Sequence, residues 1–515
     1  MEIQVMKQAA LTVEILLALL MLTGVFSCSK KPSYMEMIVN GDFSEARRLI
    51  RQDLSMNDYL TPNLRSILEL HLVRMNRIEK DFTLTESEVI DYVKKYIPDV
   101  SKENLRQWEA DKSLEYMIID GQKRFFKYAQ YNLFRLDPEL KALKKKIDSE
   151  RGEDSVKKEF PLDEHIASII TEANESGHKY VKPVKMRIKQ SLIVDENAVP
   201  DGKTICCWIP FPREIENRQT DIKILATEPA TYQLADNSKL QRTIYFEKAS
   251  NGSTKTEFSV EYTYTAHGVY VPIDPEKVVL VVNRDDLNQY LTERKPQIEF
   301  YNEMRKLSES IVGDEKNPYR IAQKLFAWVD TNITWASARE YSTFYNIPEY
   351  VIDTRHGDCG MQTLTFMTLC RMNGIPARWQ SGWEFQPPKD SMHDWGEIYF
   401  EPYGWVPMDV TYGMRKTDDE KLKWFYLSGM DSYRLIFNDD YSCSFEPGKK
   451  YFRSETIDSQ RGEAEWEEGN LYFDQWSWKL DWEVIQHCHS ERGTSEESQP
   501  IIDEILPRLV GAASE

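Results

Sequence analysis

The most informative stretch of this chain is residues 354–360 (TRHGDCG), followed by residues 361–372 (MQTLTFMTLCRM) and 373–378 (NGIPAR). The two glycines that bracket Cys359 permit a tight turn in which the backbone comes close to its neighbours. Apolar residues then recur at helical spacing, and the Gly-Ile-Pro sequence ends the helix. The pattern therefore predicts that Cys359 lies at the amino end of a buried helix.

The amino end of a helix favours cysteine chemistry in two ways. The helix dipole and the unpaired N–H groups favour negative charge, so we expect a lowered thiol pKa at Cys359. The thiolate is the reactive form of a cysteine nucleophile. The same N–H groups can face the oxyanion of a tetrahedral intermediate. Cys370, in the middle of the helix among apolar neighbours, is expected to be a core residue instead.

A β-hairpin with the remaining catalytic residues is predicted downstream of the helix. Two strand-like runs flank a Pro/Gly turn, HDWGEIYF beginning at His393 and WVPMDVT containing Asp409. His393 can deprotonate Cys359 and later protonate the leaving amine, and Asp409 can orient the imidazole. The order and spacing of the three residues favour a cysteine enzyme with a Cys-His-Asp triad.

The register of this hairpin is an obstacle to the triad. With a four-residue loop, Phe400 pairs with Trp405, and the alternation of side chains then places His393 and Asp409 on opposite faces of the sheet. We expect a bulge near Gly396 to correct this.

These motifs resemble those of the transglutaminase-like superfamily, whose pattern runs G-x-C, G-I-P-A-R, H-x-W-x-E and G-W…D-x-T. The matching segments are 357–359, 374–378, 393–397, 404–405 and 409–411. The resemblance covers residues 317–411 and implies a papain-related α+β core. It also implies catalytic roles for Cys359, His393 and Asp409, with an acyl-enzyme on the cysteine.

Further candidate site residues lie near these motifs. Asp394, adjacent to the histidine, is the second candidate for the third member of the triad. Three aromatic residues are candidate oxyanion donors, Trp335, Tyr341 and Tyr345. His356 is a possible site contact, although a loop histidine bonded to the backbone is the more ordinary interpretation. Arg378 is interpreted as structural and is expected to pair with a carboxylate near the site.

The expected fold class is α+β multidomain. The segments are a helical module (34–150), a β-sandwich-like module (181–285), the transglutaminase-like core (295–415), a β-rich C-terminal extension (430–489) and a polar tail (490–515). Period-two alternation predicts strands at 186–194, 204–209, 222–225 and 257–265, the last half-buried. Asn251-Gly252 predicts a hairpin before the last of these. A capping box at Thr85–Glu88 predicts a helix start.

Residues 1–27 are interpreted as an export signal. The apolar run ends in GVFSC at Cys28, which resembles the lipobox of bacterial lipoproteins. The resemblance implies cleavage before Cys28 and lipid attachment to it, with an ordinary signal anchor as the alternative. We therefore expect a lipid-anchored protein of the cell envelope, on the periplasmic or outer-membrane face.

Composition excludes other classes of function. The net charge of −19 over 515 residues argues against nucleic acid as a partner. Seven cysteines with no CxxC pair exclude a four-cysteine zinc site, and we expect no metal and no cofactor. A metal-dependent hydrolase is disfavoured because an H-E-x-x-H cluster is lacking.

Two hypotheses of function follow. The first is an enzyme that acts on amide bonds of proteins or peptides, by hydrolysis as a peptidase or amidase, or by acyl transfer to an amine as a transglutaminase. The sequence does not distinguish these outcomes, and no partner protein beyond the substrate is indicated. The alternative is a catalytically inactive binding or scaffold lipoprotein that keeps the same core.

Overall fold

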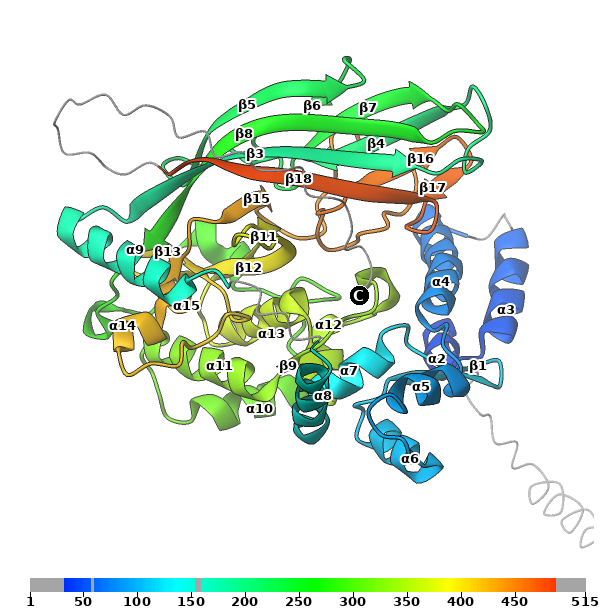
Figure 1. Ribbon diagram of the computed structural model, residues 1–515, viewed down its shortest axis with the longest axis horizontal. Coiled ribbons are helices and arrows are strands. Elements are labelled where there is room, and N and C mark those ends of the chain that lie inside the picture. The colour runs from blue at the N-terminus through cyan, green and yellow to red at the C-terminus, as the bar shows by residue number, and fades with distance from the viewer. Residues whose placement is uncertain (1–31, 57–59, 153–158, 488–515) are drawn as a thin grey trace, which may run out of the picture. The chain divides into compact units, whose positions relative to one another are not determined.

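The computed structural model describes residues 32–56, 60–152 and 159–487. These residues divide into two compact units: the described residues up to 152, with 336–344, form the first, and 159–335 with 345–487 form the second. Figure 1 shows mostly helices in the blue and cyan N-terminal part and most of the strands after it. The chain thus leaves the second unit between Trp335 and Tyr345 to contribute a short segment to the first.

The first unit is mainly helical, and side chains cap the starts of most of its helices. Ser33, Thr85 and Ser101 each form a capping box with the residue three positions on. The capping box predicted at Thr85–Glu88 is therefore confirmed. The elements are α2 (Tyr34–Asn40), α3 (Phe43–Ser55), α4 (Pro62–Asp81), α5 (Glu86–Val93), α6 (Lys102–Ala110), β1 (Tyr116–Ile119), β2 (Gln122–Phe125), α7 (Ala129–Leu136), α8 (Pro138–Glu150) and the 3₁₀ turn η4 (Tyr341–Thr343).

Polar contacts hold the 336–344 segment within the first unit. Asn132 Nδ2 donates to the Ser337 carbonyl at 2.8 Å, and Ser337 N donates back to Asn132 Oδ1 at 2.9 Å. The buried carboxylate of Asp81 accepts from Glu340 N at 2.9 Å. Side chains thus satisfy backbone groups that a buried loop would otherwise leave unpaired.

The second unit contains a sandwich of two five-stranded sheets. One sheet has the order β14-β8-β3-β18, with β5 also paired to β8, and the other has the order β17-β16-β4-β7-β6. Ile188, Tyr262 and Phe246 lie in one apolar core with residues from both sheets. The strands are β3 (Tyr180–Val194), β4 (Thr204–Pro210), β5 (Gln219–Glu228), β6 (Gln233–Leu234), β7 (Thr243–Ala249), β8 (Thr256–Tyr270), β14 (Gly429–Met430), β16 (Glu463–Trp466), β17 (Gly469–Leu471) and β18 (Trp476–His487).

Strands are present at all four segments where alternation predicted them, but β8 is not half-buried. Its polar positions Ser259, Thr263 and Thr265 are buried as well as its apolar ones. The reason is that β8 is a central strand, paired with β3 and β5 along its length.

The Asn251-Gly252 turn does not form the expected hairpin. β7 pairs with β4 and β6, whereas β8 pairs with β3, β5 and β14, so the turn carries the chain from one sheet to the other. The carbonyl of Gly252 accepts from Asn197 N at 2.7 Å. A tertiary contact therefore helps to fix this turn, and the dipeptide alone does not decide the pairing.

Strands near the C-terminus complete the sandwich. β18 runs antiparallel to β3, from Trp476 opposite Val194 onward, and β16 pairs with β4. In Figure 1 the red β18 lies along β3. Residues 430–489 were expected to form a separate C-terminal extension. Instead, β18 pairs with β3, almost 300 positions earlier in the chain.

The remaining sheet is four-stranded, with the order β13-β12-β11-β15. Helix α13 packs on β11 and β12 and against α11 and α12. The elements are α9 (Leu162–Ser176), η2 (Pro275–Lys277), η3 (Asp285–Tyr290), α10 (Asn302–Val312), α11 (Pro318–Asn332), β9 (Thr334–Trp335), α12 (Ile347–Thr354), β10 (His356–Gly357), α13 (Cys359–Met372), β11 (Ala377–Glu384), β12 (Ser391–Phe400), β13 (Gly404–Met408), α14 (Glu420–Lys423), α15 (Phe425–Ser428) and β15 (Arg434–Asn438). The predicted α+β class is therefore confirmed.

Candidate active site

Cys359 is the first residue of α13, as the sequence predicted. Asp358 caps the helix, its Oδ1 accepting from Met361 N at 3.1 Å. Every residue from Gly360 to Arg371 is buried, whereas the thiol-bearing residue itself is partly exposed. The helix thus places one reactive side chain at the edge of an otherwise closed interior.

The thiol of Cys359 donates a hydrogen bond to Asp394 Oδ2 at 3.4 Å. Within the described ranges, the thiol of Cys359 forms this hydrogen bond and forms none with His393. Burial first, and then the carboxylates of Asp394 and Asp358, raise the pKa of the thiol well above its ordinary value. The lowering expected from the helix dipole is therefore wrong for this resting arrangement, because burial, and after it the two neighbouring acids, shift the thiol pKa the other way.

His393 and Asp409 are in direct contact. His393 Nε2 lies 2.7 Å from Asp409 Oδ2, and both residues are buried. The expected hairpin register is wrong by one residue: Phe400 pairs with Gly404 and Gly396 with Met408, around a three-residue loop. Continued by one position, this register places Asp409 opposite Trp395. Trp395 is two residues after His393, so Asp409 lies on the same face of the sheet as His393. No bulge is needed between these two strands.

Asp409 is satisfied on both oxygens. Oδ1 accepts from the backbone N–H groups of Thr411 and Tyr412 at 3.2 and 3.3 Å. Oδ2 is shared between His393 and Arg434, whose Nη1 lies at 2.9 Å. Burial alone would raise the pKa of Asp409, but the neighbouring cationic groups hold it below its ordinary value. This carboxylate therefore stays ionised.

The imidazole of His393 lies among acidic groups. Burial opposes its protonation, but the carboxylates of Asp409 and Glu384 raise its pKa above the ordinary value. Glu384 Oε2 lies 3.9 Å from His393 Nε2 and accepts from the Tyr412 hydroxyl at 2.9 Å. The ring of Tyr412 meets the imidazole edge-on at 5.5 Å. An imidazolium formed here is stabilised from two sides.

Arg434 was missed by the sequence analysis. It lies on β15 with 3% of its surface exposed, and it joins Asp409 to Asp431 and Glu384. No motif surrounds Arg434, and β15 reaches the site only because it pairs with β11. The signal available in the sequence was a lone arginine among apolar residues in the predicted β-rich extension.

The other candidate residues have different surroundings. Trp335 is 43% exposed on β9, which pairs with β10 immediately before the cysteine. His356 is buried on β10, with the ring of Tyr350 at 5.7 Å. Tyr341 lies in the 336–344 segment of the first unit, and Tyr345 begins the return to the second. In the described part of the chain, the hydrogen bond of the Cys359 thiol goes to Asp394 and not to any of these four residues.

Arg378 pairs with Glu397, its Nε donating to Oε2 at 2.6 Å. Arg218 Nη1 donates to the other oxygen of Glu397 at 2.8 Å. The structural interpretation of Arg378 is therefore confirmed. The glutamate of the H-x-W-x-E motif, Glu397, therefore has a structural role: its ion pairs hold β12 in place. Its side chain lies on the face of β12 opposite Asp394.

Neither a metal site nor a membrane span is found in the described ranges. They hold no group of three or more His, Cys, Asp or Glu that could bind a metal ion. No helix among them has the length and apolar character needed to cross a bilayer. Cys28, the tail from residue 490 and the export signal lie outside the described residues.

Comparisons with known proteins agree with the motifs. Residues 305–410 match the family model of the transglutaminase-like superfamily. Over an alignment of 81 residues, the chain is 27% identical to the uncharacterized protein YebA of Bacillus subtilis. The alignment covers 13% of this chain and 11% of YebA. The chain thus spans about a tenth of the length of this curated relative.

Two solved structures are similar over larger parts of the chain. A proposed cysteine protease from Cytophaga hutchinsonii aligns with a TM-score of 0.41 at 15% identity, over 60% of this chain and 94% of that one. The periplasmic domain of TgpA from Pseudomonas aeruginosa aligns with a TM-score of 0.24 at 12% identity, over 48% and 96%.

A helix headed by a cysteine, packed on an antiparallel sheet that carries a His–Asp pair, defines an α+β protein of papain-like architecture. Within that class, residues 305–410 belong to the transglutaminase-like superfamily.

Proposed function

We propose that the protein is a cysteine enzyme that acts on amide bonds of proteins or peptides through Cys359, His393 and Asp409. The Cys359 proton passes to His393, and Sγ attacks the carbonyl carbon of the substrate. The imidazolium then protonates the leaving amine as the C–N bond breaks, which leaves a thioester on Cys359. Water or a second amine resolves the thioester and regenerates the thiol.

The contact between His393 Nε2 and Asp409 Oδ2 at 2.7 Å carries this proposal. With Nε2 engaged by Asp409, Nδ1 is the ring nitrogen left to exchange a proton with the thiol. A buried, ionised Asp409 fixes the tautomer and stabilises the imidazolium that forms. An inert core would not require a histidine whose pKa is raised by two carboxylates.

The start of α13 supplies the electrostatic part of the mechanism. The first N–H groups of a helix lack intrahelical acceptors, and Asp358 occupies that of Met361. The N–H groups nearest Cys359 can donate to the oxyanion of the tetrahedral intermediate, which forms next to Sγ. Trp335, exposed on the adjacent β9, is the candidate side chain for a further contact with substrate.

Hydrolysis is the outcome that we favour over acyl transfer, by analogy with enzymes of the cell envelope. The lipid on Cys28 would tether the protein to the periplasmic or outer-membrane face, and two or three acyl chains suffice for stable anchoring. Access of water to the thioester decides between the two outcomes. The loop before β12, which contains Pro387-Pro388, borders the histidine strand and is the part of the chain placed to control it.

The test is a comparison of Cys359→Ala with the parent on a labelled protein substrate, scored for release of label and for incorporation of a fluorescent amine. We expect the variant to lose both activities. Cys443→Ala is the matched control, because Cys443 is also a partly exposed free cysteine, and this variant should retain activity. Equal activity of parent and Cys359→Ala would remove the enzymatic proposal.

An inactive binding or scaffold protein remains the second candidate, and one observation favours it. The thiol of Cys359 is hydrogen-bonded to an acid and its pKa is raised, the opposite of an activated nucleophile. A binding protein would release no label and incorporate no amine in either the parent or Cys359→Ala, so the same experiment separates the two candidates.

A further inference from the structure

Asp394 is the acidic residue that contacts the reacting sulfur. It follows His393 on β12, so the two side chains lie on opposite faces of the strand. Asp394 is 2% exposed, and its Oδ2 accepts the hydrogen bond from Cys359 Sγ. The nucleophile is therefore bonded to the neighbour of the catalytic histidine and not to the histidine itself.

A glutamine from the C-terminal part of the chain fixes this aspartate. Gln460 Nε2 donates to Asp394 Oδ1 at 2.8 Å and to the His393 carbonyl at 2.9 Å. Gln460 is 5% exposed, and its backbone carbonyl accepts a hydrogen bond from Trp383 Nε1 at 3.1 Å. One amide group thus bridges the backbone of the histidine and the side chain that holds the thiol.

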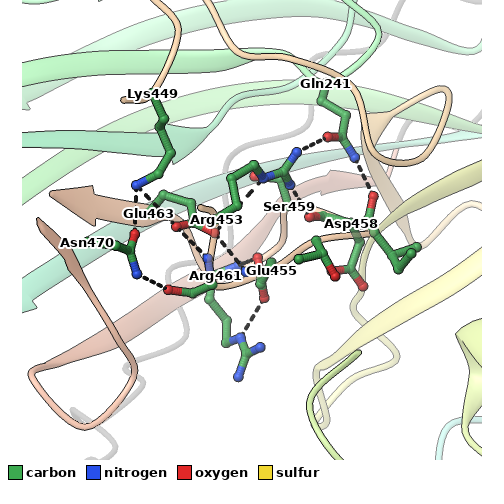
Figure 2. Close-up of polar contacts among 12 residues, drawn as sticks. Gln241, Lys449, Arg453, Glu455, Asp458, Ser459, Arg461, Glu463 and Asn470 are labelled. Carbon is green, nitrogen blue, oxygen red and sulfur yellow. Dashed lines mark hydrogen bonds and ion pairs between the residues drawn. The ribbon is translucent and has the colours of Figure 1, made fainter. Parts of the chain in front are cut away.

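The loop that carries Gln460 is held by buried ionic contacts, which Figure 2 shows. Glu455 Oε2 accepts from Gln460 N at 2.8 Å, and Arg461 Nε donates to Glu455 Oε1 at 2.5 Å. Glu463, fully buried, accepts from the backbone N–H groups of Ser454 and Glu455 at 2.9 and 2.7 Å. Gln460 is therefore presented by a loop with few degrees of freedom, as a site residue requires.

The charges around the thiol and Asp394 are mostly acidic. Asp358 from the start of α13 faces both groups, and Asp458 and Glu455 face Asp394 from the C-terminal loop. Arg461 and Arg453 face Asp458 in turn. Two acids in direct contact repel each other strongly when both are ionised, so Cys359 and Asp394 titrate as a coupled pair that tends to retain one proton.

We propose that Asp394 is a fourth catalytic residue, which keeps Cys359 as a protonated thiol in the resting enzyme, and that Gln460 is the positioning residue that holds it there. Gln460 donates to Asp394 Oδ1 and so favours the form in which the carboxylate is charged and the sulfur keeps the proton. Before the proton can move to His393, on the other face of β12, it must leave this hydrogen bond with Asp394. This inference rests on the proposed function.

The test is the pH dependence of iodoacetamide alkylation at Cys359, read by peptide mass spectrometry on the full chain. Asp394→Asn keeps the shape of the side chain and the acceptor for Gln460 but removes the charge. We expect its alkylation profile to shift to lower pH, with a rate at pH 6 raised about tenfold or more, which corresponds to one pKa unit. Asp439→Asn, which alters a carboxyl bonded to Gln380 elsewhere in the sheet, is the control and should match the parent.

Gln460→Met tests the positioning role. Without the amide that donates to Asp394, the proton shared by Cys359 and Asp394 should move toward Asp394, which leaves more thiolate. The alkylation profile should therefore shift to lower pH, as in Asp394→Asn, but by a smaller amount. In the double variant Asp394→Asn, Gln460→Met, no shift beyond that of Asp394→Asn is expected. A profile for Asp394→Asn that is unchanged or moves to higher pH would overturn the inference. Alkylation needs no turnover, so this result is independent of whether the parent acts on amides.

Discussion

Removal of Arg434 tests the electrostatic support of the candidate triad. Its guanidinium lies 2.9 Å from Asp409 and 2.8 Å from Asp431, with Glu384 at 3.4 Å. Asp409 and Asp431 are almost fully buried, so Arg434→Met leaves both carboxylates without their main cation. Breaking a buried ion pair by removing one partner costs about 3–5 kcal/mol. We expect a loss of stability of that order at pH 7.

The loss should shrink as the pH falls. In the parent, Arg434 helps to hold the pKa values of Asp409 and Asp431 below the ordinary value, despite their burial. That stabilisation is present above pH 3.8 and is lost only as the pH falls through the lowered folded values. In the variant, burial is less opposed and the two pKa values rise. Folding then favours the protonated acids, so the variant recovers relative stability between pH 7 and pH 5.

Urea unfolding followed by Trp fluorescence measures this effect. Every Trp except Trp108 lies in the second unit, so the signal reports on the unit that contains Arg434. Arg187→Met is the matched control, because Arg187 pairs with Glu261 on an exposed strand face and should matter little. A stability loss in Arg434→Met that is no larger than the control's, or that grows from pH 7 to pH 5, would refute the reasoning.

Four further outcomes are expected. His393→Gln should lower the rate of acylation of Cys359 by about 10²–10⁴-fold, the usual contribution of a general base, with the unfolding midpoint as a check on folding. In the parent, the acid limb of the pH–rate profile should lie above pH 6.5, because the pKa of His393 is raised. Asp409→Asn should move that limb to lower pH, and an unmoved limb would argue against the His–Asp contact. Gly382→Ala should destabilise the chain by about 1–3 kcal/mol or more, because its Cβ would lie 1.8 Å from the Leu435 carbonyl oxygen, whereas Gly469→Ala meets open space and should be neutral in the same unfolding assay.

Local patterns were sufficient for much of this fold. Helix α13 and its cysteine followed from the bracketing glycines, the apolar spacing and the closing Gly-Ile-Pro sequence. The long strands β3 and β8 followed from period-two alternation. These features depend on neighbours within a few residues, which is why a single sequence contains them.

Longer-range features were not accessible from the sequence. The register of β12 and β13 depends on one residue of loop length, and the sequence does not show whether Gly404 belongs to the loop or to the strand. Asn251-Gly252 has the composition of a hairpin turn, yet β7 and β8 belong to different sheets. A turn motif describes the local backbone and not the partner of each strand.

The surroundings of the site residues were the least predictable part. Asp394 was second choice for the triad because it adjoins His393, and the structure gives it the thiol as partner. Arg434 and Gln460 reach the site from segments 25 and 51 positions after Asp409. Their positions depend on β15 and on the buried loop before β16, and neither is marked by a motif.

Acylation by an activated ester tests most directly whether Cys359 is a nucleophile served by His393. The parent, Cys359→Ala and His393→Gln are each mixed with p-nitrophenyl acetate, quenched in acid, and analysed by intact and peptide mass spectrometry. The proposed mechanism predicts one acetyl group on Cys359, released over time, absent in Cys359→Ala and formed at least about a hundredfold more slowly in His393→Gln. Labelling of Cys443 as fast as Cys359, at a rate that does not depend on His393, would contradict it.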